Sequence, residues 1–364
     1  MKKHVCDSII LPDDRHETVE NADFSKLDAL YAGRKAYYGD YHCHSDSGGS
    51  SDGQTTPTEW KEYMKQLHLD FVGLMDHRQV RHMYLPEFDP ELFLYGTEPA
   101  LGWHDPAVDF HYLMIVPRPE CLLRVLEKFT DAYDFTGGEE GRFVYKTIEK
   151  ARFLEIVQAI MDEGGTVVHP HPKQVMKSDD PEQYCFGEGT ALETIYSYKQ
   201  GLYCQNTVDN YKLWMELLDR GHKIYNTATT DCHGTPNNEA FNTVYSHEKN
   251  GAAYLSYLRK GDLTAGYAGI QMAIEDTSMG GTAAYAPGQT LCIRVDDGHP
   301  DRWDESETYR LDVLTDKGLA CSMPLTLPFA AALQVQERKF YRAVVIRESD
   351  GAPVAIGNPI WLTK

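Results

Sequence analysis

Phe71-Val72-Gly73-Leu74-Met75-Asp76-His77 is an apolar run that ends abruptly in an acid and an imidazole. Its length and apolar character are typical of a buried strand. In parallel α/β folds, catalytic groups gather at the carboxyl ends of such strands, so Asp76 and His77 occupy a position that is functional in this fold. The alternative is a structural hydrogen-bonded Asp-His pair, and Asp76 can also orient a metal ligand instead of binding metal itself.

The same rhythm of apolar run, polar turn and helical pattern extends from about residue 36 to residue 262. Further runs with strand character lie at 113–116, 166–168, 192–196 and 223–227. Helical patterns lie at 58–67, 149–163, 210–218 and 248–260. Thr56-Pro57-Thr58-Glu59 supplies a hydroxyl cap, a proline and an early acid, which predict a helix start. The alternation indicates an α/β fold built of β/α units.

The pattern changes beyond about Gly266. Turns rich in Gly, Pro and Asp there separate strand-like pieces at 291–295, 309–314 and 341–346. This change predicts a small antiparallel β domain at the end of the chain. Since 364 residues exceed the usual size of one domain, a large catalytic domain with a small accessory domain is expected.

Composition argues against several classes of protein. Hydrophobic residues make up 42% of the chain, which supplies a core and argues against disorder. The formal charge of −20, with no dense basic run, predicts that nucleic acid is not the main partner. The chain has no apolar stretch that would span a membrane, and residues 1–20 lack the continuous apolar core of a signal peptide. The eight dispersed cysteines fit a reducing, cytoplasmic location.

Two short segments carry alternating pairs of metal-type donors. His42 and His44 follow strand-compatible residues, and alternation in a strand turns both imidazoles to one face, where they can chelate one ion. Asp231 and His233 repeat this arrangement after the run 223–230. Taken alone, each pair is as well explained by partly exposed surface or turn residues.

Glu98 and His111 each lie at the boundary of a predicted strand. A carboxylate in such a position can bridge two metal ions. Taken singly, either residue is more often an ordinary solvated side chain.

His169-Pro170-His171-Pro172 ends the run 166–168. Its two prolines forbid regular continuation and hold the imidazoles in an extended loop. His169, next to the strand, is the better candidate ligand. His171 is equally well interpreted as a substrate contact or as a locally packed side chain.

Together these donors resemble the ordered motifs of the PHP family, named for polymerase and histidinol phosphatase: HxH, DH, a Glu, a His, another His and DxH. The matching residues, in order, are His42/His44, Asp76/His77, Glu98, His111, His169 and Asp231/His233. The resemblance covers roughly residues 36 to 265. Within the family the chain looks most like the CehA/McbA-type branch, because Ser51-Asp52-Gly53 and a Thr-Pro helix start follow the first motif.

The resemblance implies a distorted (β/α)7, TIM-like barrel that binds two or three divalent ions, for which Zn, Mn and Fe are all suitable. It implies an N-terminal extension at 1–35 packing on the barrel, a metallohydrolase domain at 36–265 and a β-rich domain at 266–364. The implied ligand sets are His42, His44, Glu98 and Asp231 for one ion, Glu98, His111 and His169 for a second, and Asp52, His77 and His233 for a third. The third set departs from the family pattern, which has a histidine where this chain has Asp52.

The resulting hypothesis is a phosphoesterase acting on a small anionic phosphate ester. A hydroxide bridging two ions would attack phosphorus while the cations neutralise the developing charge. His233, His77 or His171 would protonate the leaving oxygen. Lys173 or Lys199 would hold an anionic group, with a solvated surface lysine as the alternative for each.

Two other functions stay open at this point. The same kind of centre can attack the carbonyl of a carbamate, ester or amide. In a different class of function, the metals would only brace the fold of a binding or scaffold module. The residues identify neither the substrate, nor the metal, nor the oligomeric state.

Overall fold

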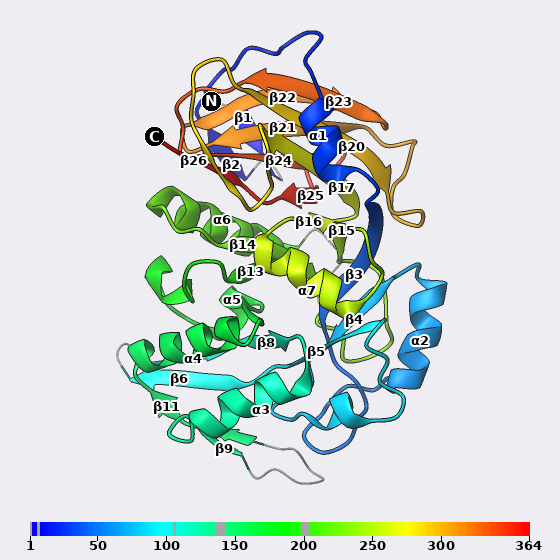
Figure 1. The fold of residues 1–364 in the computed structure, drawn as a ribbon, viewed down its shortest axis with the longest axis vertical. Coiled ribbons are helices and arrows are strands. Elements are labelled where there is room, and N and C mark those ends of the chain that lie inside the picture. Colours follow the sequence, from blue (N-terminus) through cyan, green and yellow to red (C-terminus); the bar gives the residue numbers. More distant parts are fainter. Residues whose placement is uncertain (1, 6–7, 105–106, 136–142, 198–203) are drawn as a thin grey trace. The chain divides into compact units, whose positions relative to one another are not determined.

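A computed structural model describes residues 2–5, 8–104, 107–135, 143–197 and 204–364 (Figure 1). The chain divides into two compact units. Unit 1 comprises Met1–Tyr38, Asn242–Glu248 and Lys260–Lys364, and unit 2 comprises Gly39–Phe241 and Lys249–Arg259. Unit 2 contains the predicted metal ligands.

The sheet of unit 2 has the strand order β14-β13-β12-β8-β5-β4-β3. The strands are β3 (Lys35–Cys43), β4 (Phe71–Leu74), β5 (Phe93–Thr97), β8 (Leu113–Val116), β12 (Thr166–His169), β13 (Ala191–Tyr196) and β14 (Tyr225–Thr229). Neighbours in the segments β3-β4-β5 and β12-β13-β14 run parallel. The predicted mixed α/β class is therefore confirmed, whereas closure of the sheet into a barrel stays a prediction.

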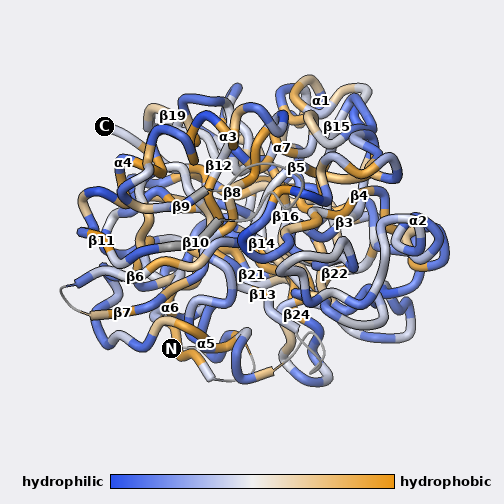
Figure 2. Tube along the Cα trace, turned by 90° about the horizontal axis from the view of Figure 1, so that it is seen from below, coloured by the Kyte–Doolittle hydropathy of each residue, from blue (hydrophilic) through white to orange (hydrophobic). Residues whose placement is uncertain are grey.

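Strand β8 departs from the simple β/α repeat, because it runs antiparallel to both β5 and β12. No crossover helix separates β5 from β8 in the described chain. The connection is instead the hairpin of β6 (Ala100–His104) and β7 (Ala107–His111), and such a connection returns the chain in the opposite direction. The residues just before β8 thereby reach the edge where the parallel strands end. All four residues of β8 are hydrophobic and buried. Figure 2 colours the Cα trace by the hydropathy of each residue and labels β8.

Helices follow several strands of unit 2, and one of them begins at the start signal that the sequence supplies. Helix α2 (Pro57–Gln66) has the predicted cap: Thr56 and Glu59 form a reciprocal capping box, with Pro57 in the first turn. Helices α3 (Pro119–Lys128), α4 (Lys150–Asp162) and α6 (Gln205–Arg220) follow β8, β11 (Thr147–Ile148) and β13. Helix α6 ends at Gly221, whose φ of 100° terminates the helix in the left-handed region.

Unit 1 is built mainly of strands. One of its sheets runs β15 (Asn242–Ser246), β16 (Thr264–Gly266), β25 (Pro353–Gly357), β24 (Phe340–Arg347), β21 (Tyr309–Thr315) and β22 (Gly318–Leu325). A second sheet runs β18 (Thr277–Ser278), β17 (Ala268–Ile274), β20 (Thr290–Gly298) and β23 (Phe329–Gln334). The strand-like pieces predicted at 291–295, 309–314 and 341–346 lie in β20, β21 and β24. The predicted domain boundaries at residues 36 and 265 stay a prediction.

The helices in the described part of the chain are all too short or too polar to cross a bilayer.

Candidate metal centre

The predicted donors of unit 2 lie at the ends of several strands or just after them. His42 lies in β3 and His44 directly follows it, while Glu98 follows β5. His111 ends β7, and Asp231 follows β14. Because β8 is reversed, His111, which precedes that strand, reaches the same edge as residues that follow the parallel strands.

The first cluster consists of His42, His44, Glu98 and Asp231, all of them buried. The Nε2 atoms of His42 and His44 lie 3.1 Å apart. Each Nε2 lies 3.2 Å from Glu98 Oε2. Asp231 Oδ1 lies 3.3 Å from His42 Nε2 and 3.2 Å from His44 Nε2. Four donor atoms thus converge on one small space.

The spacing and chemistry of this cluster fit a divalent ion. Zinc bonds of about 2.0–2.1 Å in a tetrahedron place neighbouring ligand atoms about 3.3–3.4 Å apart, close to the separations found here. Asp231 Oδ1 is buried and has no hydrogen-bond partner in the described chain. A buried carboxylate oxygen without a partner is costly, and a cation between these four atoms would remove that cost.

Glu98 lies at the junction of two clusters. Its Oε2 faces His42 and His44, and lies 3.1 Å from His77 Nδ1. Its Oε1 lies 2.8 Å from His111 Nδ1 and 2.9 Å from His171 Nε2. His77, Glu98 and His111 form the second cluster. One fully buried carboxylate is therefore shared among five imidazoles.

A third cluster combines His44, Asp52, His77 and His233. Asp52 Oδ1 lies 3.3 Å from His233 Nε2 and 3.7 Å from His77 Nε2. The side chain of Asp52 is 58% exposed and that of His77 is 20% exposed. These donors border the open side of the centre, and exposed groups of this kind often lie close together without an ion.

The two histidines of the HPHP segment have different surroundings. His171 lies against Glu98, whereas His169 is in none of the three clusters of the described chain. His169 Nδ1 lies 3.1 Å from the carbonyl of Tyr184, and its ring stacks on Phe186 with centroids 4.0 Å apart. A carbonyl at Nδ1 fixes the tautomer that leaves Nε2 available to a metal, so the ligand role predicted for His169 stays a prediction.

Glu193 is a functional candidate that the sequence reasoning missed. Its Oε1 lies 2.8 Å from His42 Nδ1, and its Oε2 accepts the His171 backbone N–H at 2.7 Å. A carboxylate behind a ligating imidazole fixes the tautomer and the ring orientation. The available signal was a single acid inside the apolar strand β13, where every residue is buried.

Three further residues hold the loops that carry the donors. Asp40 accepts hydrogen bonds from the backbone N–H of His42 and from Thr230. Asp76 accepts hydrogen bonds from Ser45 and Ser47, in the loop after the HxH motif, and belongs to no cluster of the described chain. Tyr196 donates its hydroxyl to Asp231 Oδ2 at 3.0 Å.

The electrostatics of the centre are set by burial and by these close pairs. Burial alone would lower the pKa of His42, but Glu98, Glu193 and Asp231 raise it well above its ordinary value. Burial would raise the pKa of Glu98, but His42, His111 and His77 hold it well below its ordinary value. Burial lowers the pKa of His169 to about 3, so this imidazole is neutral at pH 7. Metal-binding imidazoles are neutral, so an ion bound here would have to displace the proton that the raised pKa keeps on His42.

Two residues of the centre adopt a left-handed backbone conformation that L-residues rarely take. Asp231 has φ 47° and His171 has φ 29°. Such conformations persist where the surroundings over-determine them, and they cluster at functional sites.

The two lysines predicted to bind substrate receive little support from the structure. Lys173 donates to the Tyr184 hydroxyl at 3.2 Å and to the Ser178 carbonyl at 3.4 Å, and its ammonium lies 4.3 Å from the centre of the Tyr184 ring. Its donors are thus directed into the segment 171–184. Lys199 lies outside the described residues.

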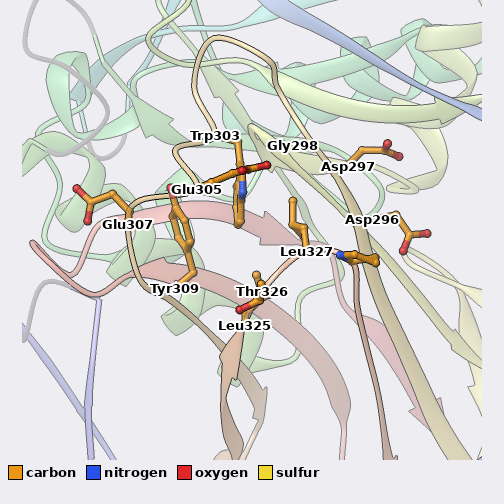
Figure 3. A pocket seen from close by; sticks show the side chains of 11 residues that line it. Asp296, Asp297, Gly298, Trp303, Glu305, Glu307, Tyr309, Leu325, Thr326 and Leu327 are labelled. Atoms are coloured by element: carbon orange, nitrogen blue, oxygen red, sulfur yellow. The ribbon is translucent and has the colours of Figure 1, made fainter.

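Cavity volume alone does not identify this centre. A cavity of about 580 Å³ in unit 1 is lined by Trp303, Tyr309 and four carboxylates, and by none of the predicted site residues (Figure 3). The Trp303 ring stacks on Tyr309 with centroids 4.0 Å apart. Gly298 packs so closely that an added Cβ would lie 2.5 Å from Trp303 Cγ. The indole is therefore already engaged in packing.

No protein-family model and no curated protein matches the chain. Among solved structures, it is similar to a two-domain protein from Bacteroides vulgatus described as containing a predicted PHP-like metal-dependent phosphoesterase. That similarity has 13% identity, 96% of this chain and 98% of the other covered, and a TM-score of 0.44. The chain is also similar to the lesion-specific endonuclease Q of Pyrococcus furiosus, with 16% identity and a TM-score of 0.42. That similarity covers 62% of this chain and 56% of the endonuclease. A third similar structure is an amidohydrolase from Chromobacterium violaceum with bound sulfate and no metal, with 17% identity and a TM-score of 0.35. That similarity covers 54% of this chain and 87% of the amidohydrolase.

Proposed function

We propose that this protein is a metal-dependent phosphoesterase that hydrolyses a small phosphate ester. The observation that carries the proposal is the position of Glu98, whose two oxygen atoms face two separate groups of imidazoles. A carboxylate shared in this way is suited to hold two ions a short distance apart. Paired ions suit displacement at phosphorus, because both the attacking and the leaving oxygen carry charge.

The residues divide into two proposed ligand sets. His42, His44, Glu98 and Asp231 would hold one ion. Glu98 would also serve the second ion, together with His77 and His111. His169 would join them through Nε2, the ring nitrogen opposite the one that faces the Tyr184 carbonyl. Divalent ions bound there would supply Lewis acidity toward a phosphoryl or carbonyl oxygen. We also propose a third ion, held by Asp52, His77 and His233. Zn, Mn and Fe are all suitable for these sites.

Other side chains of the centre orient the proposed ligands or border the face from which a substrate would approach. His77 and His233 are 20% and 19% exposed, so they border the face from which a substrate would approach. Both are proposed to contact the leaving group. His171 is almost fully buried against Glu98, which supports a role in holding that carboxylate over a role in contacting substrate. Glu193 and Tyr196 orient His42 and Asp231.

A substrate panel tests the reaction class. The metal-replete protein would be offered a phosphomonoester, a phosphodiester, nucleotides, an aryl carbamate and a DNA duplex with an abasic site. Glu98→Gln serves as the inactive variant and Glu188→Gln, at an exposed carboxylate, as the matched control. Hydrolysis of a small phosphate ester supports the proposal. Hydrolysis of the carbamate alone would replace it with the carbonyl hydrolase expected of a CehA/McbA-like protein, and cleavage of the duplex alone would overturn the expectation of a small substrate.

Elemental analysis of protein purified without chelator separates an enzyme from a scaffold. At least one tightly bound ion per chain is expected, with a lower unfolding temperature after chelation. Less than one ion per chain, together with an unchanged unfolding temperature after chelation, would defeat the enzyme proposal.

A further inference from the structure

A second group of chemically active side chains lies in unit 2, outside the metal centre. Cys185 Sγ lies 3.6 Å from His222 Nδ1. The opposite ring nitrogen, His222 Nε2, lies 2.9 Å from Glu182 Oε2. The three side chains come from the first turn of η3 (Pro181–Tyr184), the residue after η3 and the segment after α6. A thiol, an imidazole and a carboxylate thus form a continuous line of contacts.

The polarity of these contacts follows from the chemistry of the groups. Ionised Glu182 can only accept a hydrogen bond, so the proton of a neutral His222 resides on Nε2. Nδ1 then carries the lone pair, which faces the Cys185 thiol. This is the order of nucleophile, base and orienting acid that activates a thiol by proton removal.

The surroundings of Cys185 combine partial access with a net preference for the neutral thiol, to which the carboxylates of Glu182 and Glu188 contribute. The thiol is partly exposed. Burial raises its pKa, while the backbone N–H of Gly187 and the ammonium of Lys150 act in the opposite direction. Proton transfer to His222 therefore matters more for its reactivity than spontaneous ionisation. At Gly187, two residues along the chain, an added Cβ would meet nothing within 4 Å, so the backbone there borders open space.

We infer that Cys185 is a reactive thiol and a site of covalent modification by small electrophiles, above all hydroperoxides, with His222 as its base and Glu182 as the residue that positions the base. In the reaction with hydrogen peroxide, the S–O bond forms as the O–O bond breaks. The thiol proton passes to His222 Nδ1 and then to the departing hydroxide, which leaves as water. Sulfur is oxidised by two electrons to the sulfenic acid, and the peroxide is reduced.

The segment that carries this thiol also contacts His169. The extended backbone of Cys185 directs its side chain away from those of Tyr184 and Phe186. Both aromatic rings stack on His169, and the Tyr184 carbonyl faces its Nδ1. Modification of Cys185 is therefore expected to weaken metal retention. This consequence, unlike the reactivity of the thiol, rests on the proposed function.

Thiol reactivity is tested by mass spectrometry of the folded protein treated with iodoacetamide or hydrogen peroxide. Cys185 is expected to react at least about tenfold faster than Cys204 and Cys321, the two other partly exposed thiols of the described chain, because a well-placed base contributes that much or more. His222→Gln should slow Cys185 at least about tenfold and Glu182→Gln by a smaller factor. Glu188→Gln removes a negative charge that raises the pKa of the Cys185 thiol, so this variant should not slow the reaction. Nitrogen chemical shifts of His222 should show a protonated Nε2 in the wild type, a signature that loss of packing would not mimic.

The outcomes separate the two parts of the inference. Equal labelling of Cys185, Cys204 and Cys321, or an unchanged rate in a folded His222→Gln variant, would overturn the reactive thiol. Peroxide treatment should release more metal from the wild type than from Cys185→Ser, and equal release would overturn the link to the metal centre. Protein that never binds metal refutes the proposed function and the link, while the labelling rates still decide whether the thiol is reactive.

Discussion

Replacement of Glu193 by Gln isolates the carboxylate behind His42. Glu193 offers two acceptor oxygens to two donors, the His42 Nδ1–H and the His171 backbone N–H, at 2.8 and 2.7 Å. Gln has nearly the same shape but offers one acceptor and one NH2 group. If the amide oxygen faces His171, the NH2 group faces His42 and drives its proton to Nε2, the atom directed into the first cluster. If the oxygen faces His42, the buried N–H of His171 loses its partner.

Either arrangement weakens the centre by an amount that can be stated in advance. Removal of a carboxylate partner of a metal-binding histidine costs about 10- to 100-fold in metal affinity, or about 1.4–2.7 kcal/mol. We expect a loss in this range, since Glu193 and His42 are both almost fully buried and water cannot replace the missing acceptor. The assay is a competition titration against a metal-buffering chelator, with bound metal measured at each step.

Glu188→Gln is the matched control, because Glu188 is an exposed carboxylate near the start of the same strand. Urea unfolding of the metal-free proteins separates metal affinity from fold stability. A folded Glu193→Gln variant with wild-type metal affinity would refute the reasoning, because it would mean that the carboxylate does not set the tautomer of His42.

Three further substitutions probe other parts of the chain. Glu98→Gln places an NH2 group among the imidazoles and is expected to reduce hydrolysis at least about 100-fold and to lower the bound metal measured by elemental analysis; full metal content would contradict a shared ligand. Asp52→Asn removes the carboxylate of the exposed cluster and is expected to lower the metal stoichiometry by one ion while the buried ligand set stays filled; an unchanged stoichiometry would rule out a third ion at Asp52. Asp14→Asn in unit 1 is expected to lower the free energy of unfolding at pH 7 by about 1–3 kcal/mol. Burial would raise the pKa of Asp14, but hydrogen bonds from Arg338 and Thr315 hold it below its ordinary value. A carboxyl group whose pKa is lowered in the folded protein stabilises the fold at pH values above its pKa in the unfolded chain, about 3.9. The difference in unfolding free energy between wild type and Asp14→Asn, measured by urea titration, should therefore shrink from pH 7 to pH 3. A difference that stays constant over this range would contradict the assignment.

Local patterns in the sequence predicted part of this structure well. The capping box of Thr56 and Glu59 forms as expected, because a helix start depends on residues within one turn. Alternation along a strand predicted that His42 and His44 share a face, and their Nε2 atoms do lie side by side. Such features need no information about distant parts of the chain.

Features set by tertiary pairing were not accessible in the same way. The direction of β8 depends on the β6-β7 hairpin, and nothing in its apolar run distinguishes a parallel strand from an antiparallel one. Glu193 appeared as one acid in a strand, and only the position of His42 across the sheet gives it a role. His171 contacts Glu98, whereas His169 stacks on Phe186, and the sequence alone does not show that this aromatic residue packs there.

The donors of the centre come from opposite ends of unit 2, with His42 near its beginning and His233 near the end of its long segment. The complete ligand set therefore does not exist in a chain that ends before Asp231, and bringing its members together requires the closure of a long loop. Metal capture would then report completion of folding. A growing chain should therefore retain metal tightly only after the residues that follow β14 have been made.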